Sequence, residues 1–328
     1  IMDSHSISQI IEKYISSVRM SRSSHTAGTY ANALKFFVET LDKIGIDAEG
    51  TPIDKLSEDT VIAMATDLKN HAATTERLYL TAVSGFFEFI SAENLSAVNL
   101  PRIKLLINQR ARRPGVRLPQ FPSSSIDALL SKISEERFLS LDSDEDKLIS
   151  YRDRAFLLTL ADTGLRVHEA VNLRRGDVDW NEGKAMIIGK GNQQAIVRFS
   201  TRATDALMDY LKLRAKIDGS TRIPLSALPL FARHDRGAGK KIKPLTTTTG
   251  RNIVSKRVLE ILGADAVGTI TPHSFRHYFV TRVLRSSGNL KLAQELARHK
   301  NIAVTQRYAH LSNDELDKGY WNAIEEES

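Results

Sequence analysis

The helical periodicity of this chain stops at a segment rich in arginine, glycine and proline, and this break divides the sequence in two. Between Pro101 and Pro122 the apolar repeat fails, and four basic residues alternate with Pro and Gly: Arg110, Arg112, Arg113 and Arg117. Because Pro and Gly interrupt regular elements, we expect a basic domain linker over residues 101–122. The 328 residues suffice for two domains, each with its own core.

Residues 1–100 predict a small all-helical domain. Apolar side chains recur at helical spacing within residues 7–15, 30–41 and 78–90. Ser23 or Ser24 is expected to cap the second helix, and Ser57 is expected to cap a third with acidic residues in its first turn. No unit of 20 to 50 residues repeats, which excludes solenoids and propellers.

Residues 123–311 predict a second, mainly helical domain with a β-hairpin. Apolar residues 185–188 and 195–199 flank a Gly-Lys-Gly-Asn turn at 189–192. One helix is expected to end at Thr163-Gly164 and restart at Arg166. Thr271-Pro272 predicts another helix start, because the hydroxyl caps and Pro suits the first helical position. Gly288 is expected to end that helix, and residues 290–297 to form the next.

The last residues, 312–328, predict a short tail helix. Leu316, Tyr320 and Ile324 follow helical spacing, so the helix has an apolar stripe that must be buried somewhere. We expect it to pack either on its own domain or on a neighbouring protomer.

Composition excludes several classes of protein and indicates the kind of partner. The absence of Cys excludes disulfides and thiol catalysis, and no apolar run approaches the ~18 residues of a membrane span. We therefore expect a cytoplasmic protein without membrane association. The net charge of +7 is uneven: residues 1–100 carry −5, residues 101–119 hold six basic and no acidic side chains, and residues 151–311 carry +15. This distribution favours a polyanionic partner, although a solvated basic face is the alternative.

Individual polar residues of the second domain each have two interpretations. His273 and Arg276 lie three apart on one helical face, where they can share a phosphate or form a surface salt-bridge pair. Arg166 stands at a helix start, where a cation gains nothing from the helix dipole. It indicates either an anionic ligand or an ion pair with Glu169. Three further residues have ordinary explanations as a hairpin tip, a helix cap and a packed aromatic: Lys190, His299 and Tyr308.

Taken in order, these residues form a recognisable series. Thr163 to Glu169 (TGLRVHE), 189–192 (GKGN), 273–277 (HSFRH), 296–299 (LARH) and 306–308 (QRY) together resemble the tyrosine recombinase family of lambda-type and Xer-type integrases. The resemblance spans residues 120–311. It implies an all-α N-terminal core-binding (SAM-like) domain and a mixed, mainly α C-terminal catalytic domain with a small antiparallel β-sheet.

The resemblance also implies roles for the residues. Arg166 and Arg276 would hold the charge that develops on the non-bridging phosphate oxygens, and His273 and His299 would add donors, His273 being the better candidate base. Tyr308 would attack phosphorus to give a 3′-phosphotyrosine, and Lys190 would protonate the leaving 5′-oxygen. Glu169 would brace the site from behind. We expect no cofactor and no metal, because neither a complete P-loop nor a His-Glu-x-x-His pattern is present.

The implied partner is double-stranded DNA with an inverted-repeat recombination site, bound by a clamp of both domains and the linker. The expected DNA contacts are Arg22, Thr26, Tyr30, Arg77, Arg112, Arg113, Lys241, Arg251 and Lys256. The family further implies a monomer or dimer when free, a homo-tetramer on two DNA sites, and in some cases accessory proteins. Two departures from its common pattern are Gln193-Gln194 after the turn and Ala297-Arg298 where Leu-Gly is frequent. We expect the second to leave the chemistry untouched.

These observations predict a site-specific recombinase that works through a Holliday junction, in a mobile-element integrase or Xer-like role. One alternative keeps the chemistry without strand exchange, as in a type IB topoisomerase or telomere resolvase. The other is a DNA-binding protein on the same fold without catalysis.

Overall fold

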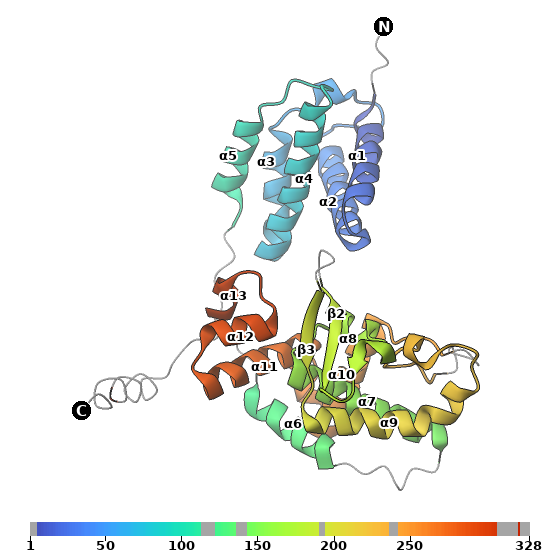
Figure 1. Cartoon of the computed structure of the whole chain (residues 1–328). Helices are drawn as coiled ribbons and strands as arrows, with labels where there is room; N and C mark the ends of the chain where they lie inside the picture. Colours follow the sequence, from blue (N-terminus) through green and yellow to red (C-terminus); the bar gives the residue numbers. More distant parts are fainter. Residues whose placement is uncertain are drawn as a thin grey trace. The chain divides into compact units, whose positions relative to one another are not determined.

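The computed structural model describes residues 5–112, 122–135, 143–189, 194–235, 242–306 and 321. The chain divides into two compact units, Ile1–Val116 and Arg117–Ser328, which are described separately below (Figure 1). Within the described residues, no helix combines the length and the apolar character needed to cross a membrane.

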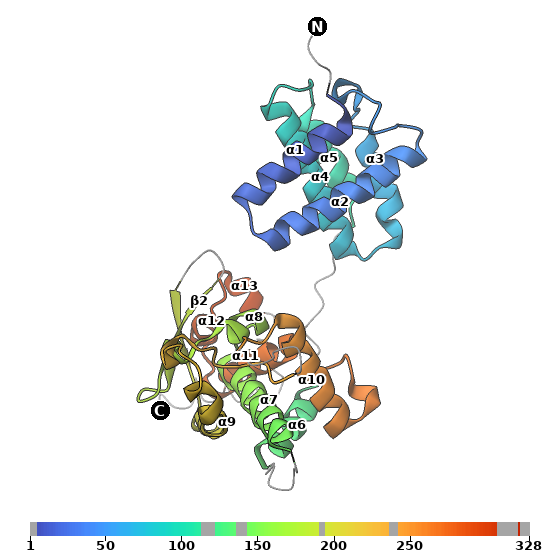
Figure 2. The same ribbon diagram turned by 90° about the vertical axis from the view of Figure 1, so that its right-hand side faces the viewer.

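The first unit is all-helical, as the periodicity predicts. Its central helix, α4, contacts the four other α-helices, and Figures 1 and 2 show them gathered around it. Phe37, Phe86 and Phe87 are fully buried in the core of this unit. The helices are α1 (Ile7–Ser21), α2 (Ser24–Lys43), α3 (Thr60–Asp67), α4 (Ala73–Ala92) and α5 (Leu100–Arg110), with 3₁₀ turns η1 (Ile53–Lys55) and η2 (Leu68–Asn70).

Two helix boundaries of the first unit bear on the predicted caps. Ser23 caps α2 as predicted, by accepting a hydrogen bond from the backbone N–H of Thr26. The cap predicted at Ser57 is wrong, because α3 begins only at Thr60. The two acidic residues after Ser57 are used elsewhere: Glu58 accepts a hydrogen bond from the backbone of Asn99 at 2.8 Å, and both pair with Arg102 of α5.

The expected linker over residues 101–122 is wrong for its first half, because residues 100–110 form α5. Pro101 starts this helix rather than interrupting it, and Asn99 caps it by accepting from the backbone N–H of Arg102. Ile103 and Leu106 are buried, so α5 belongs to the core of the first unit.

Arg112, which follows α5, is tied to the same unit. Its Nε donates to the fully buried carboxylate of Glu76 at 2.5 Å, its backbone N–H donates to Glu76 at 3.0 Å, and its Nη2 donates to the carbonyls of Leu68 and His71. Lys69 donates to Glu76 from the other side at 2.7 Å. Burial raises the pKa of Glu76, but these three groups outweigh it and the net pKa is lowered.

The second unit is mainly helical, with a small sheet. Helix α7 runs through its middle and contacts α6, α8, α9, α11 and β3 (Figures 1 and 2). The helices are α6 (Ser123–Glu135), α7 (Asp144–Thr163), α8 (Val167–Asn172), α9 (Thr201–Gly219), α10 (Thr247–Leu262), α11 (Pro272–Ser287), α12 (Leu290–Ala297) and α13 (Ile302–Gln306), with 3₁₀ turns η4 (Arg175–Asp177), η5 (Leu225–Ala227) and η7 (Ala264–Ala266).

The predicted hairpin is present as β2 (Lys184–Ile188) and β3 (Gln194–Arg198), which pair antiparallel. The sequence pattern missed β1 (Val178–Asp179), because two residues are too few to show alternation. The sheet order is β1-β2-β3. Ala185, Ile187 and Val197 are buried toward the helices.

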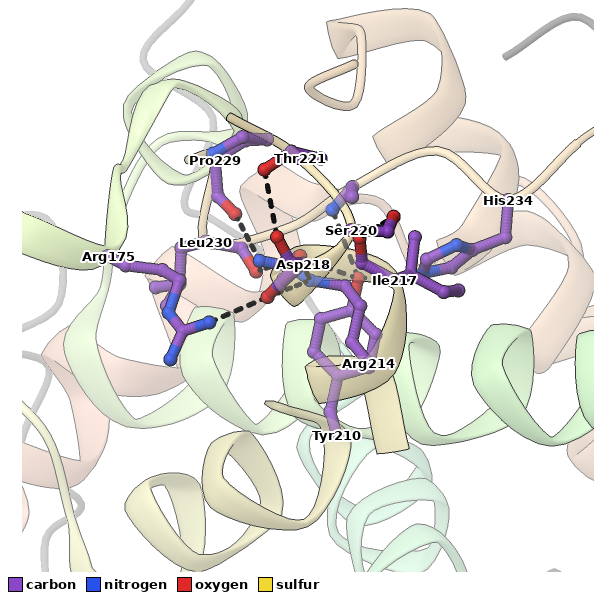
Figure 3. Close-up of polar contacts among 11 residues, drawn as sticks. Arg175, Tyr210, Arg214, Ile217, Asp218, Ser220, Thr221, Pro229, Leu230 and His234 are labelled. Carbon is purple, nitrogen blue, oxygen red and sulfur yellow. Dashed lines mark hydrogen bonds and ion pairs between the residues drawn. The ribbon is translucent and has the colours of Figure 1, made fainter. Parts of the chain in front are cut away.

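A buried polar network fastens the loop after η5 to α9 (Figure 3). Arg214 of α9 has no exposed surface, and each of its three nitrogens donates: Nε to Asp218, Nη1 to Tyr210 and to the carbonyl of Leu230, Nη2 to the carbonyl of Pro229. Arg175 completes the network by donating to Asp218 at 2.6 Å. Because Arg214 has no exposed surface and each of its nitrogens donates inside the protein, this cluster stabilises the fold.

Candidate active site

The turn between α7 and α8 places Arg166. Helix α7 ends at Gly164, whose φ of 60° lies in the left-handed region that favours glycine. A Cβ at this position would also lie 2.4 Å from the ring of Phe279 on α11. Arg166 then caps α8, so the break predicted at Thr163-Gly164 is confirmed.

Glu169 of α8 holds Arg166 through two hydrogen bonds. The backbone N–H of Arg166 donates to Oε2 at 2.9 Å, and Nη1 donates to Oε1 at 2.8 Å. The ion pair proposed as the ordinary interpretation of Arg166 is therefore present, but 40% of the Arg166 side chain remains exposed. Burial raises the pKa of Glu169, and the hydrogen bonds and positive charges around it outweigh burial, so the net pKa is lowered.

Helix α11 presents His273 and Arg276 beside Arg166. Thr271 caps this helix with its side chain and Pro272 is its first residue, as predicted. Arg276 is 3% exposed and donates from Nη1 to the carbonyl of Gly164 at 2.6 Å and from Nη2 to the carbonyl of Ala297. Arg276 thus joins the α7–α8 turn to the end of α12, and the alternative of a surface salt-bridge pair with His273 does not describe it.

An open groove of about 430 Å³ lies next to these residues. Arg166, His273 and Arg276 all line it, together with Arg251 of α10. Three guanidinium groups and an imidazole along one groove form a site for an anion with several oxygens, since each planar guanidinium can donate to two of them.

His299 lies just beyond the end of α12. Arg298, which precedes it, is left-handed, with φ 57° and ψ 46°. The His299 ring is within hydrogen-bond distance of Thr305 Oγ1 on α13, 2.8 Å from Nδ1, and Gln294 donates to its carbonyl at 3.0 Å. These contacts fix the imidazole after the turn, where it lines a second groove together with Arg298 and residues of β3 rather than the groove of Arg166 and His273.

Burial and neighbouring guanidiniums keep the histidines of the site neutral. Burial first, then Arg276 and Arg166, lower the pKa of His273 and lower that of His299 to about 4. Burial, His273 and Arg276 lower the pKa of His277 to about 4, and its ring packs edge-on against His273 at 4.2 Å between centroids. A neutral imidazole can accept a proton, which is the state that a general base requires.

Several predicted site residues fall outside the described part of the chain. These are Lys190, Tyr308, Arg113 and Lys241. The predicted tail helix over 312–328 also lies outside it, apart from Trp321. Among the described His, Cys, Asp and Glu side chains, no group of three is placed to hold a metal ion.

The remaining predicted DNA contacts are distributed over both units. Arg22 and Arg77 are exposed on the first unit, and Thr26 and Tyr30 are half-buried on α2. On α10, Arg251 lines the groove. Lys256 instead forms an ion pair on the same helix, with its Nζ 3.7 Å from Oε1 of Glu260. Arg112 is engaged with Glu76, so its guanidinium first serves the fold of its own unit.

Two functional candidates were missed by the sequence motifs. Arg298 was expected to have no effect, yet it donates to Glu169 Oε2 at 3.1 Å and to the carbonyl of Gly164 at 3.4 Å. The sequence contained an indication of this role, because Arg298 is a long cation directly before His299, at a position where the common pattern has Gly. His277 belongs to the quoted HSFRH motif but carried no predicted role.

Comparison with known proteins places this geometry in a family. The family described as phage integrase matches residues 130–315, more than half of the chain, and its N-terminal SAM-like domain matches residues 11–94. The chain belongs to the phage integrase family. The expected fold class, a SAM-like helical domain and a mainly helical catalytic domain with a small antiparallel sheet, is confirmed, and the sheet has three strands in the described residues.

Among curated relatives of this chain are proteins named tyrosine recombinase XerC. The Vibrio cholerae protein is 35% identical over 181 residues, which are 55% of this chain and 53% of that protein. The chain thus spans about half the length of this relative in the match. The Listeria monocytogenes protein is 30% identical over 77% of this chain and 76% of its own.

Among solved structures, XerH site-specific recombinase bound to palindromic difH substrate, described as a post-cleavage complex, has a similar fold. Its TM-score is 0.67 with 20% identity, and the match covers 96% of this chain and 84% of that one.

Proposed function

We propose that this protein is a site-specific DNA recombinase that cuts and rejoins duplex DNA by transesterification. The observation that supports it best is the groove lined by Arg166, His273 and Arg276. A phosphodiester repels nucleophiles because it is an anion, so its cleavage needs cations aimed at the oxygens where charge develops. Both guanidiniums are held in place beside the groove, Arg276 by backbone carbonyls and Arg166 by Glu169.

The reaction that we propose exchanges one phosphoester for another. The phenol oxygen of Tyr308 bonds to phosphorus, the bond to the sugar 5′-oxygen breaks, and Lys190 gives that oxygen a proton. His273, neutral because its pKa is lowered, accepts the phenol proton. Arg166, Arg276 and His299 donate to the non-bridging oxygens. A 5′-hydroxyl from a second duplex then gives its proton to Lys190 and bonds to phosphorus, the bond from phosphorus to the Tyr308 oxygen breaks, and His273 returns the proton to that oxygen. One pair of such exchanges forms a Holliday junction and a second pair resolves it.

We propose that the substrate is a pair of inverted arms on double-stranded DNA, in a mobile-element integrase or Xer-like role. The XerH structure of similar fold holds palindromic DNA, which supports this choice. Two protomers would bind one site and a homo-tetramer would join two sites, since a repeated half-site requires a symmetric assembly. Arg22, Thr26, Tyr30, Arg77 and Arg251 are the DNA contacts that we carry forward, with Lys241 and Arg113 from the sequence.

Covalent trapping tests this proposal. The purified protein is mixed with fragmented DNA carrying nicks, because loss of a short 5′-hydroxyl fragment prevents religation, and the denatured protein–DNA adducts are sequenced. We expect fragments that share inverted arms around one cleavage position, and no adduct with Tyr308→Phe. Adducts without any common sequence, together with relaxation of arbitrary supercoiled DNA, would favour a topoisomerase-like activity. DNA binding without adducts would favour the non-catalytic alternative.

Binding to DNA should depend steeply on salt. If the protein neutralises six to ten phosphates, affinity falls by roughly 10³-fold or more between 50 and 200 mM salt. Fluorescence anisotropy with a labelled duplex measures the slope, and a flat dependence contradicts a phosphate-binding clamp.

A further inference from the structure

Arg298 has a backbone conformation and a mostly buried side chain that the proposed reaction does not explain. It ends α12 in the left-handed conformation that helices usually reserve for Gly. Such a conformation is strained for a residue with a side chain. Among the described residues that have a Cβ, Asn94 is the other with positive φ, and Asn tolerates this region better than Arg does.

The side chain of Arg298 is turned into the protein. It is 13% exposed, and its Nη2 lies 3.1 Å from Oε2 of Glu169 and 3.4 Å from the carbonyl of Gly164. Arg276 donates to the same carbonyl. Residues 129 positions apart in the sequence are thus joined at the α7–α8 turn that carries Arg166.

Glu169 consequently stands between two guanidiniums. Its Oε2 accepts from the backbone of Arg166 and from Arg298, and its Oε1 accepts from Arg166 Nη1. The carboxylate is 1% exposed, so its orientation depends on these donors. A carboxylate shared by two cations also neutralises each of them less completely than a carboxylate that serves one cation.

We propose that Arg298 is a positioning residue for DNA cleavage, which holds Glu169 and thereby keeps Arg166 oriented and incompletely neutralised at the groove. This inference rests on the proposed function. Arg298 acts through Glu169 and has no contact with the reacting atoms in the proposal. Partners behind a functional group commonly change activity by about 10- to 100-fold.

Substitutions at Arg298 can separate its side chain from its backbone. Arg298→Gly and Arg298→Asn both suit the left-handed conformation, so each removes the guanidinium without adding strain. Arg298→Lys keeps the charge but loses the planar fork. Asn94 is exposed just after α4, and its φ of 54° is also in the left-handed region. Asn94→Gly is therefore the matched control for substituting a residue with a left-handed backbone conformation.

The readout is the single-turnover rate of covalent adduct formation at saturating nicked DNA, with the dissociation constant measured in parallel. We expect Arg298→Gly and Arg298→Asn to fold, to bind DNA within about twofold of the unchanged protein, and to react about 10-fold or more slowly. Arg298→Lys should recover part of the rate, and Asn94→Gly should react normally. An unchanged rate in Arg298→Gly would overturn the proposal.

A double-mutant cycle identifies the route of the effect. If Arg298 acts through Glu169, the rate of the double variant Glu169→Gln with Arg298→Gly should equal that of Glu169→Gln alone. If the fold-reductions in rate of the two single variants multiply in the double variant, Arg298 does not act through Glu169.

A measurement without DNA separates this inference from the proposed function. In the free protein, the backbone N–H of Arg166, which donates to Glu169 Oε2, should exchange faster with solvent in Arg298→Gly than in the unchanged chain, because Glu169 is less restrained. If the unchanged protein forms no adduct but this difference is seen, the recombinase proposal fails while the positioning role stands. An unchanged exchange rate contradicts the positioning role itself.

Discussion

Two arginine–carboxylate networks in the second unit are built from the same groups but differ in how much of the arginine remains exposed. In the first, Arg214 is fully buried and each of its three nitrogens donates to Asp218, Tyr210 or a backbone carbonyl (Figure 3). In the second, Arg166 is held on one side by Glu169, and 40% of its side chain stays exposed along a groove. A cluster of charges can bind a ligand when its hydrogen bonds orient a guanidinium but leave part of that group exposed.

The difference has an energetic counterpart. A buried ion pair that is fully satisfied is costly to break, because removing one partner leaves the other charged and unpaired in the interior. An exposed guanidinium fixed by one carboxylate contributes little to stability but is oriented before its ligand arrives. Substitutions in the two networks should therefore separate stability from activity.

The largest effect is expected from Arg166→Lys. A lysine ammonium lacks the planar fork that lets Arg166 hold Glu169 with one edge and present donors to phosphate oxygens with another, so the rate of adduct formation should fall by about 100-fold or more. The melting temperature should stay nearly unchanged, since the arginine is partly exposed. Single-turnover kinetics and thermal unfolding measure the two quantities. Arg222→Lys, at an exposed position, is the matched control. A rate close to that of the control would mean that Arg166 is only structural.

The next effect is expected from Asp218→Asn in the buried network. This change leaves Arg214 without its carboxylate and should destabilise the second unit by about 3 kcal/mol. Calorimetry should show a melting temperature lower by roughly 6–12 °C. Asp205→Asn, an exposed site on the same helix, removes the same charge as a control. Below its melting temperature, Asp218→Asn should still form the adduct at the normal rate; a specific loss of rate would break the distinction between the networks.

The smallest effect concerns pH. Burial, then Arg152 and Arg214, lower the pKa of His234 to about 3, and this ring lies 2.8 Å from the hydroxyl of Tyr210. A lowered pKa means that the unfolded chain binds the proton more readily than the folded chain does. The stability from a neutral His234 is therefore complete above pH 6.5 and is lost progressively as the pH falls toward 3.

Replacing His234 by Gln removes this titration while keeping a polar partner for Tyr210. The melting temperature of His234→Gln should fall less between about pH 6.5 and pH 4 than that of the unchanged protein. His25→Gln, on the surface of the first unit, is the matched histidine substitution. If the melting temperatures of His234→Gln and of the unchanged protein fall in parallel as the pH is lowered, protonation of His234 does not contribute to the pH dependence of stability.

Local patterns predicted the parts of the molecule that depend on neighbours in sequence. The start of α11 follows from Thr271-Pro272, and the hairpin follows from two apolar runs on either side of the glycine-rich turn at residues 189–192, because capping, proline geometry and turn formation are local. Pro101 was misread for a related reason: the same residue interrupts a helix from within and starts one at its first turn. The buried positions of Ile103 and Leu106 decided between these outcomes.

What sequence could not predict depends on contacts between distant residues. Arg112 meets Glu76 across 36 positions, so an expected DNA contact is also tied to a buried carboxylate of its own unit. Arg298 meets Glu169 across 129 positions, which brought an unassigned side chain to the site. Arg166, His273 and Arg276 could be grouped only because their order resembles a family, and the groove that gathers them is a property of the packed α8, α10 and α11.

The central claim, that this groove presents a phosphodiester to a tyrosine, is tested most directly by mapping the adduct. After covalent trapping on nicked DNA, nuclease and protease digestion followed by mass spectrometry identifies the residue that carries the nucleotide. The account predicts a 3′-phosphonucleotide on Tyr308 and a free 5′-hydroxyl on the released strand. A nucleotide on another residue, or a released strand that ends in 5′-phosphate, would contradict it.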